Sequence, residues 1–190
     1  PESFKEGAQT LEGEALPLQQ TERSVKALVR IPSCGAVSVV PLSGDASKEK
    51  AAQKAVSVNM DGADFVLQNS KVKAVVNGKG EVISFVLKES GREFAAAPLN
   101  RLHLYKDVPR LFDAWDIDSN YIDQEVEALR DAKVEIAGEG LEAVLKVTGK
   151  ISESSFVQYI RLAADSSRLV FETEIDWKEL HRLLKTAFPV

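Results

Sequence analysis

The chain has 190 residues, 44% of them hydrophobic and 28% charged, which is enough for one domain or for one domain and part of another. A net charge of −5 at pH 7 provides no basic surface for nucleic acid or for an anionic membrane. No apolar run approaches the roughly 18–20 residues that a membrane-spanning helix requires. The first residues have neither the basic start nor the apolar stretch of a secretory signal.

Two further features bear on the origin of the chain. A single cysteine, Cys34, excludes an internal disulfide and favours a cytoplasmic protein. The chain starts at Pro1 and stops inside the apolar stretch 183–190. Since an edge strand left bare by truncation invites aggregation, we expect the chain to be a segment of a larger protein.

Residues 24–42 have the alternating pattern of two strands, separated by turn-forming residues at 32–35. Beyond residue 42 the sequence becomes small and polar. We predict a linker over 46–62, with room for one helical turn capped by Asp45 or Ser47.

Strand patterning dominates after the linker. Apolar runs occupy 65–67, 72–76 and 82–87, and the last two are separated by 77–80, which begins Asn-Gly. Asn-Gly between two apolar runs predicts a hairpin, because both central residues of that turn must accept a positive φ.

The remainder of the chain, from residue 123, shows longer alternating runs and no alternation of strands with helices. The predicted strands are 133–136, 141–147, 156–162, 169–175 and 183–188. The predicted turns are 137–140, 152–155 and 165–167. Strands at this spacing predict an all-β fold of large antiparallel sheets packed as a β-sandwich.

The most unusual local composition is 113–118, where three carboxylates and an indole fall within six residues. Sugars are bound by flat aromatic faces and by carboxylates that accept hydrogen bonds from hydroxyls. Asp113, Trp115, Asp116 and Asp118 are therefore candidate substrate-binding residues. The alternative is a turn whose carboxylates cap backbone amides while the indole packs inward as a plug.

Other chemically active residues favour structural roles. His103 and His181 stand in strand-like contexts without an Asp or His at ligand spacing, so we expect packed or solvated strand residues. The sequence offers no metal ligand set and no catalytic residue. Trp177 is expected in the core at a strand end, and Cys34 lacks a neighbouring base that would activate its thiol.

The loop and its flanks resemble a known family. Asn-Arg-Leu-His-Leu-Tyr-Lys-Asp-Val-Pro precedes the loop at 100–109, and Asp-Trp-Lys-Glu, Leu-Leu-Lys and Phe-Pro-Val follow within 176–190. The chain resembles the C-terminal β-region of glycoside hydrolase family 38, the α-mannosidases, where similar patterns occur in this order. It departs from the family at Gln68, where Glu is frequent.

The resemblance implies a domain organisation. Residues 1–45 would be the tail of a small β-domain, 46–62 a linker, and 63–190 the N-terminal part of a galactose-mutarotase-like supersandwich. It also implies that the loop approaches the mannose site, with an aromatic side chain at or near Trp115. The family's nucleophile and its His and Asp ligands for a divalent metal, zinc or similar, belong to an N-terminal catalytic region that this chain lacks.

The function implied is that of a non-catalytic β-region of a retaining α-mannosidase, which supplies scaffold and part of the sugar-site wall. The complete enzyme would hydrolyse terminal α-mannosides, and the chain alone, without a cofactor of its own, would be inactive. Its partners would be the glycan substrate and the catalytic region, not nucleic acid or membrane. Two alternatives remain: a stand-alone carbohydrate-binding or adhesion β-sandwich, and an epimerase or lyase, which needs a catalytic His or Tyr-Arg grouping.

Overall fold

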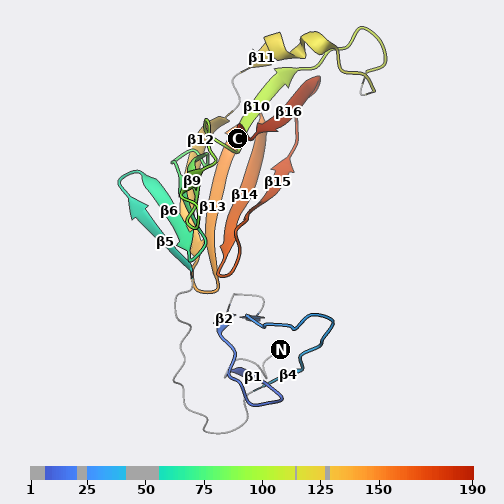
Figure 1. Ribbon diagram of the computed structural model, residues 1–190. Coiled ribbons are helices and arrows are strands. Elements are labelled where there is room, and N and C mark those ends of the chain that lie inside the picture. The colour runs from blue at the N-terminus through green and yellow to red at the C-terminus, as the bar shows by residue number, and fades with distance from the viewer. Residues whose placement is uncertain (1–6, 21–24, 42–55, 114, 127–128) are drawn as a thin grey trace.

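The computed structural model describes residues 7–20, 25–41, 56–113, 115–126 and 129–190, and these form antiparallel sheets with one short 3-10 helix (Figure 1). Two sheets face each other as a sandwich. A three-stranded sheet extends from one end of the sandwich, and four short N-terminal strands lie beyond the other end. Within these described ranges, no helix is long and apolar enough to cross a membrane.

The first layer of the sandwich is a five-stranded sheet in which consecutive strands are neighbours. Its strands are β5 (Val56–Asp61), β6 (Asp64–Asn69), β7 (Val72–Val76), β8 (Val82–Leu87) and β9 (Arg92–Glu93). In the turn between β7 and β8, the Gly80 N–H donates to the Asn77 carbonyl at 2.9 Å, and Gly80 has a φ of 82°. The predicted hairpin at 77–80 is confirmed.

The second layer has four longer strands, again in chain order. They are β12 (Leu129–Gly138), β13 (Glu142–Ile151), β14 (Ser154–Ala163) and β15 (Leu169–Asp176). The turn at Ser152, which has a φ of 55°, lies inside the predicted turn 152–155, and the turn after Gly138 extends one residue beyond the predicted turn 137–140, because β13 begins at Glu142. The period-2 alternation of apolar residues therefore predicted this layer correctly.

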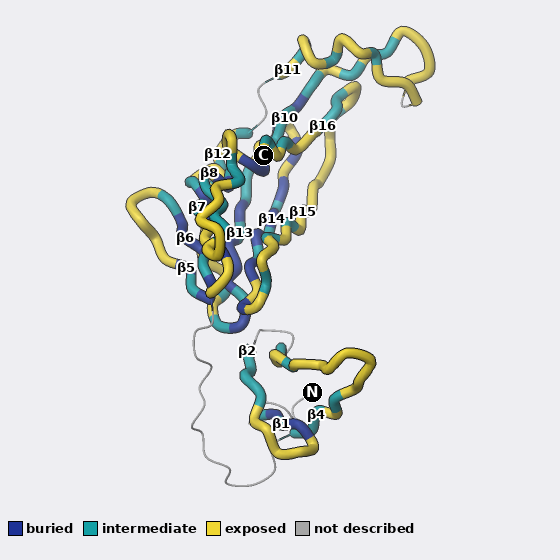
Figure 2. Tube along the Cα trace, viewed as in Figure 1, coloured by how far each residue is buried: buried dark blue, intermediate teal, exposed yellow. Residues whose placement is uncertain are grey.

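The core lies between the two layers, where buried residues concentrate (Figure 2). Along β14 the buried positions alternate with partly exposed ones, as expected for a strand with one face on the core. Burying each large aliphatic side chain contributes roughly 1.5–3 kcal/mol. The largest side chains that are fully buried include Leu67, Leu145, Ile151, Ile160 and Leu162.

One polar pair is buried with this core. The Asn100 and Gln158 side-chain amides exchange hydrogen bonds of 2.7 and 3.2 Å, and Gln158 also donates to Thr173 Oγ1 at 2.8 Å. Asn100 Nδ2 donates to the Gly80 carbonyl at 2.9 Å. These bonds satisfy polar groups whose burial would otherwise be costly, and they fix the β7–β8 turn to the second layer.

The extension consists of β11 (Glu125–Val126), β10 (Arg101–Lys106) and β16 (Arg182–Ala187), with β10 in the centre. Leu104 of β10 is fully buried and pairs with Leu184. The 3-10 helix η2 (Ser119–Gln124) precedes β11, and its Tyr121 ring meets the Tyr105 ring edge-on at 5.1 Å.

The N-terminal part contains two separate pairs of three-residue strands. β1 (Ala8–Thr10) pairs with β4 (Val39–Pro41), and β2 (Leu18–Gln20) pairs with β3 (Val25–Ala27). The predicted turn at 32–35 is present, since the Gly35 N–H donates to the Pro32 carbonyl at 3.0 Å. The strands predicted within 24–42 are shorter than expected and pair with other segments, because local alternation does not identify a distant partner.

The all-β antiparallel fold class is confirmed. The predicted linker differs from the structure at its end, because Val56–Asp61 form strand β5, whose Val56 and Val58 are buried in the core. Their alternation was obscured by the polar composition before them. Asp45, Ser47 and the rest of 46–55 lie outside the described residues, and the division at residues 45 and 62 stays a prediction.

Candidate functional site

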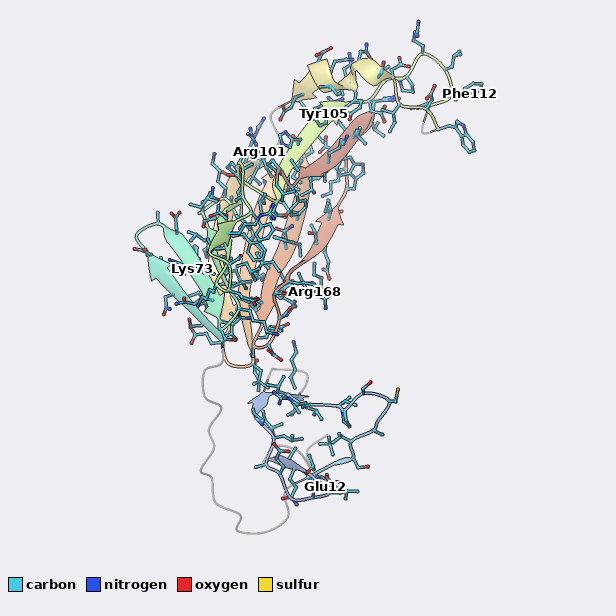
Figure 3. All side chains as sticks on the ribbon, in the orientation of Figure 1. Glu12, Lys73, Arg101, Tyr105, Phe112 and Arg168 are labelled. Atoms are coloured by element: carbon cyan, nitrogen blue, oxygen red, sulfur yellow. The ribbon has the colours of Figure 1, made fainter. Side chains whose placement is uncertain are left out.

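The candidate loop lies between β10 and η2, at the tip of the extension (Figure 3, near Phe112). It is held beside the β15–β16 connection by the Asp107 N–H, which donates to the His181 carbonyl at 2.9 Å. A second contact joins Asp113 Oδ1 to His181 Nδ1 at 3.5 Å. Residues more than 60 positions apart in the sequence therefore form one end of the molecule.

A tight turn presents the indole. Phe112 has a φ of 54°, and its carbonyl accepts hydrogen bonds of 3.0 Å from the N–H groups of both Trp115 and Asp116. The Trp115 residue is 88% exposed. The alternative that the indole packs inward as a plug is therefore wrong, and the aromatic face is free to meet another molecule.

The three carboxylates of the loop have different surroundings. Asp118 is tied into the loop, because its Oδ2 accepts from the Arg110 N–H at 3.3 Å and lies 3.8 Å from Arg110 Nε. That is the backbone-capping role of the structural alternative. Asp113 faces His181, and Asp116 is exposed. The structure thus leaves Trp115, Asp113 and Asp116 accessible and gives Asp118 a structural role as well.

Large apolar side chains are exposed in this loop, in η2 and in the β15–β16 connection. Each is at least 48% exposed: Val108, Leu111, Phe112, Ile117, Ile122 and Leu180. A group of exposed apolar side chains on a projecting loop is typical of a surface that another protein segment or ligand covers. We call this end of the molecule, residues 107–113 and 115–118 with Leu180, the loop surface.

Each histidine faces one carboxylate. His103, a partly buried residue of β10, has its Nδ1 2.6 Å from Glu125 Oε1, and His181 faces Asp113. His103 is a packed strand residue as expected, whereas the exposed His181 precedes β16 and has a φ of 51°. Among the described residues, no three His, Cys, Asp or Glu side chains come together in a group that could hold a metal ion.

The segment that follows β15 differs from expectation. Trp177, predicted in the core, is 41% exposed. Glu179 holds the β13–β14 turn, since its Oε1 accepts from the N–H groups of Glu153 and Ser154 at 2.8 and 3.0 Å and from Ser154 Oγ at 2.9 Å. Partial burial raises the pKa of the Glu179 carboxyl, but these hydrogen bonds outweigh it and lower the pKa below its ordinary value.

A pocket of about 510 Å³, which the sequence did not predict, lies at the junction of the three sheets. Its charged lining residues are Lys79, Glu81, Arg101 and Glu125. Three apolar residues, Leu102, Val126 and Leu129, complete it. We call it the junction pocket. No local sequence motif predicts the junction pocket, because its residues come from the β7–β8 turn, β10, β11 and β12.

Comparisons with known proteins agree with the family that the sequence resembles. Residues 67–190 match the family described as the glycosyl hydrolases family 38 C-terminal domain. Alpha-mannosidase 2C1 of Homo sapiens is 31% identical over 168 residues, and the mouse protein of the same name is 29% identical over 168 residues. Alpha-mannosidase G of Dictyostelium discoideum is 24% identical over 144 residues.

These matches cover most of this chain but only a small part of each relative. They cover 86% of this chain for the human and mouse proteins and 69% for the Dictyostelium protein. The same matches cover only 16% of the two mammalian proteins and 13% of the Dictyostelium protein, so the chain spans a small part of its relatives' length. With its all-β fold and its matching C-terminal two thirds, the chain belongs to glycosyl hydrolase family 38, as part of the C-terminal β-region.

Proposed function

We propose that this chain is a non-catalytic part of a retaining α-mannosidase, in which it supplies scaffold and one wall of the sugar site. The observation that carries the proposal is the loop surface, where an 88% exposed indole stands beside the carboxylates of Asp113 and Asp116. The relatives are named alpha-mannosidases, and the substrate proposed is accordingly a terminal α-mannoside or a glycan that carries one.

The composition of the loop surface supports two contacts at once. An indole face and accessible carboxylates suit a sugar ring and its hydroxyls. The neighbouring Leu111, Phe112 and Leu180 are too apolar for a sugar alone, and their exposure suits packing against the catalytic region of the same polypeptide. The loop surface would then lie where that region meets the substrate.

A divalent metal, zinc or similar, is proposed for the complete enzyme only because the family implies one. The described side chains offer pairs of one histidine and one carboxylate rather than a complete ligand set. The ligands of such an ion would therefore come from the catalytic region. The cytoplasmic location expected from the single free cysteine, Cys34, is likewise retained as a proposal.

The test is Trp115→Ala in the complete protein, with kcat/KM for an aryl α-mannoside as the readout. Loss of a stacking contact of roughly 1 kcal/mol lowers kcat/KM about fivefold, and more if the indole also orients the sugar. Trp115→Phe keeps an aromatic face and should lower kcat/KM less than Trp115→Ala does. Met60→Ala, which removes an exposed apolar side chain from the β5–β6 hairpin, serves as the control and should leave kcat/KM unchanged.

A stand-alone carbohydrate-binding module is the alternative function, and the same exposed indole favours it. The two differ in what the isolated chain does. A module binds mannosides through Trp115 without any other polypeptide, and its Trp115→Ala variant loses that binding. An unchanged kcat/KM for Trp115→Ala in the complete enzyme would remove the site-wall proposal.

A further inference from the structure

The junction pocket, formed by three sheets, has no part in the proposed role of the loop surface. Arg101 stands at the start of β10, and the loop surface begins after Lys106 at the other end of this strand (Figure 3). Six strand residues at about 3.3 Å each place Arg101 roughly 16 Å or more from the loop surface, whereas Glu125, which pairs with Tyr105, lies nearer to it. A volume of about 510 Å³ is within the range of small-ligand sites.

The turn that carries Lys79 and Glu81 is held rigidly. Asn77 Oδ1 accepts from the N–H groups of Lys79 and Glu81 at 2.9 and 3.0 Å, and Asn77 Nδ2 donates to Glu81 Oε2 at 2.8 Å. Gly80 is buried against Val147, and its carbonyl accepts the bond from Asn100. One cation and one anion are thus presented to the pocket from a fixed backbone.

Strands β10 and β11 supply a second pair of charges, Arg101 and Glu125. Glu125 is oriented by His103, whose Nδ1 lies 2.6 Å from Glu125 Oε1, and one carboxylate oxygen remains for other partners. The exposed Arg101 and Lys79 form no ion pair with any residue in the described part of the chain. The pocket therefore contains two unpaired cationic donors and two carboxylate acceptors.

This balance of charges selects the chemistry of the ligand. An anion would meet Glu81 and Glu125, and a cation would meet Lys79 and Arg101, so a ligand with net charge gains little. A neutral polyol can donate to the carboxylates and accept from the cations at the same time. The apolar Leu102, Val126 and Leu129 would cover the C–H face of a ring.

We propose that the junction pocket binds a neutral saccharide, and specifically the remote part of a mannose-containing oligosaccharide. The identity of the sugar rests on the proposed function, whereas the existence of the site rests on the pocket alone. In a complete enzyme, such a site would bind a part of the glycan that is distant from the bond to be cleaved. Its loss would therefore raise KM for oligosaccharides and leave KM for small aryl mannosides unchanged.

The experiment is an NMR titration of the 190-residue chain with mannotriose, and with mannose 6-phosphate as the charged comparator. We expect saturable binding of mannotriose in the millimolar range, as befits an open site with a few hydroxyl contacts. Arg101→Met and Glu125→Gln should each weaken it about tenfold. Arg168→Met, which removes an exposed arginine near the far end of the sandwich, is the matched control and should bind normally (Figure 3).

Each outcome decides the proposal. Binding that Arg101→Met weakens about tenfold and Trp115→Ala leaves intact supports the junction pocket. Binding that only Trp115→Ala weakens places the sugar on the loop surface and overturns this inference. That outcome favours the stand-alone module, and kcat/KM of Trp115→Ala in the complete protein then decides the proposed function separately. Absence of saturable mannotriose binding, or salt-sensitive binding of mannose 6-phosphate alone, overturns this inference as well. Thermal unfolding of each variant checks that the exposed substitutions leave the fold intact.

Discussion

Gly80 links the fold to the junction pocket at the level of one residue. Its φ of 82° is open to glycine and strained for other residues, and a Cβ placed there would lie 2.9 Å from Val147 Cγ1. The residue is buried because the β7–β8 turn closes over β13. The backbone of the turn can approach the core this closely only without a side chain.

We therefore expect Gly80→Ala to destabilise the chain strongly. Left-handed backbone costs roughly 1–2 kcal/mol in a non-glycine residue, and the overpacking against Val147 adds about 1–3 kcal/mol. Gly62→Ala is the matched control, because Gly62 has a φ of 63° with no atom near the added Cβ. Urea unfolding should show the larger loss for Gly80→Ala, and equal losses would mean that the Val147 contact relaxes freely.

The site residues show how far residue types alone can lead. The loop composition selected Trp115, Asp113 and Asp116 as candidates, and the structure leaves all three accessible. The composition did not distinguish Asp118 from the accessible carboxylates, because its hydrogen bond from the Arg110 N–H depends on how the loop turns back. Trp177 was misplaced in the core because the strand pattern does not show that β15 lies at the edge of its sheet.

At the scale of elements, Glu179 fastens the β15–β16 connection to the β13–β14 turn. Its carboxylate accepts three hydrogen bonds, and Ser154 Oγ accepts a further one from the Lys178 N–H at 2.9 Å. The pKa of Glu179 is lowered in the folded chain from an ordinary value of 4.5. Its contribution to stability is therefore complete above that value and is lost as the pH falls through the folded pKa.

Glu179→Gln tests this linkage. At neutral pH the variant should have a lower free energy of unfolding than wild type, because the ionised carboxylate stabilises the folded chain. This difference should narrow at pH values below 4.5. The exposed Glu153, on the same turn, supplies the control variant Glu153→Gln, for which we expect a smaller difference at neutral pH. A Glu179→Gln difference that stayed constant across the acid range would contradict the role of the ionised carboxylate.

The strands themselves were largely predictable from local sequence. Strands β6 to β8 and β12 to β16 follow from apolar alternation and turn residues such as Asn77 and Gly78. The three-residue strands β1 and β2 and the two-residue strands β9 and β11 are too short to carry a period. Their existence depends on the partner strand, and so does the meeting of β10, β11 and β12 that creates the junction pocket.

At the scale of the whole molecule, the sandwich has a continuous core but incomplete cover. Within the described part of the chain, β15 and β16 are edge strands, and the loop surface exposes its large apolar side chains. Uncovered edges and apolar patches favour association, so this surface suits packing against further polypeptide. This incomplete cover agrees with the finding that the chain spans only 16% of the length of the human and mouse relatives.

The isolated chain lacks the pair of carboxyl groups that glycoside hydrolysis requires. A retaining glycosidase requires two carboxyl groups about 5–5.5 Å apart, one on each side of the scissile bond. In the loop surface, Asp118 is tied to Arg110 and Asp113 faces His181, and an indole can act as neither the general acid nor the nucleophile. The chain should therefore not hydrolyse an aryl α-mannoside, with or without added zinc, cobalt or calcium.

The assay compares the purified chain with its Asp113→Asn and Asp116→Asn variants at equal concentrations. Trace turnover that is identical in all three preparations indicates a contaminating host mannosidase and leaves the prediction intact. Turnover that co-purifies with the chain, depends on added metal and disappears in one of the variants would show that the loop surface is itself catalytic. In that case the carboxylates of 113–118 would have to rearrange on binding, since their present contacts hold Asp118 in the loop turn and Asp113 against His181.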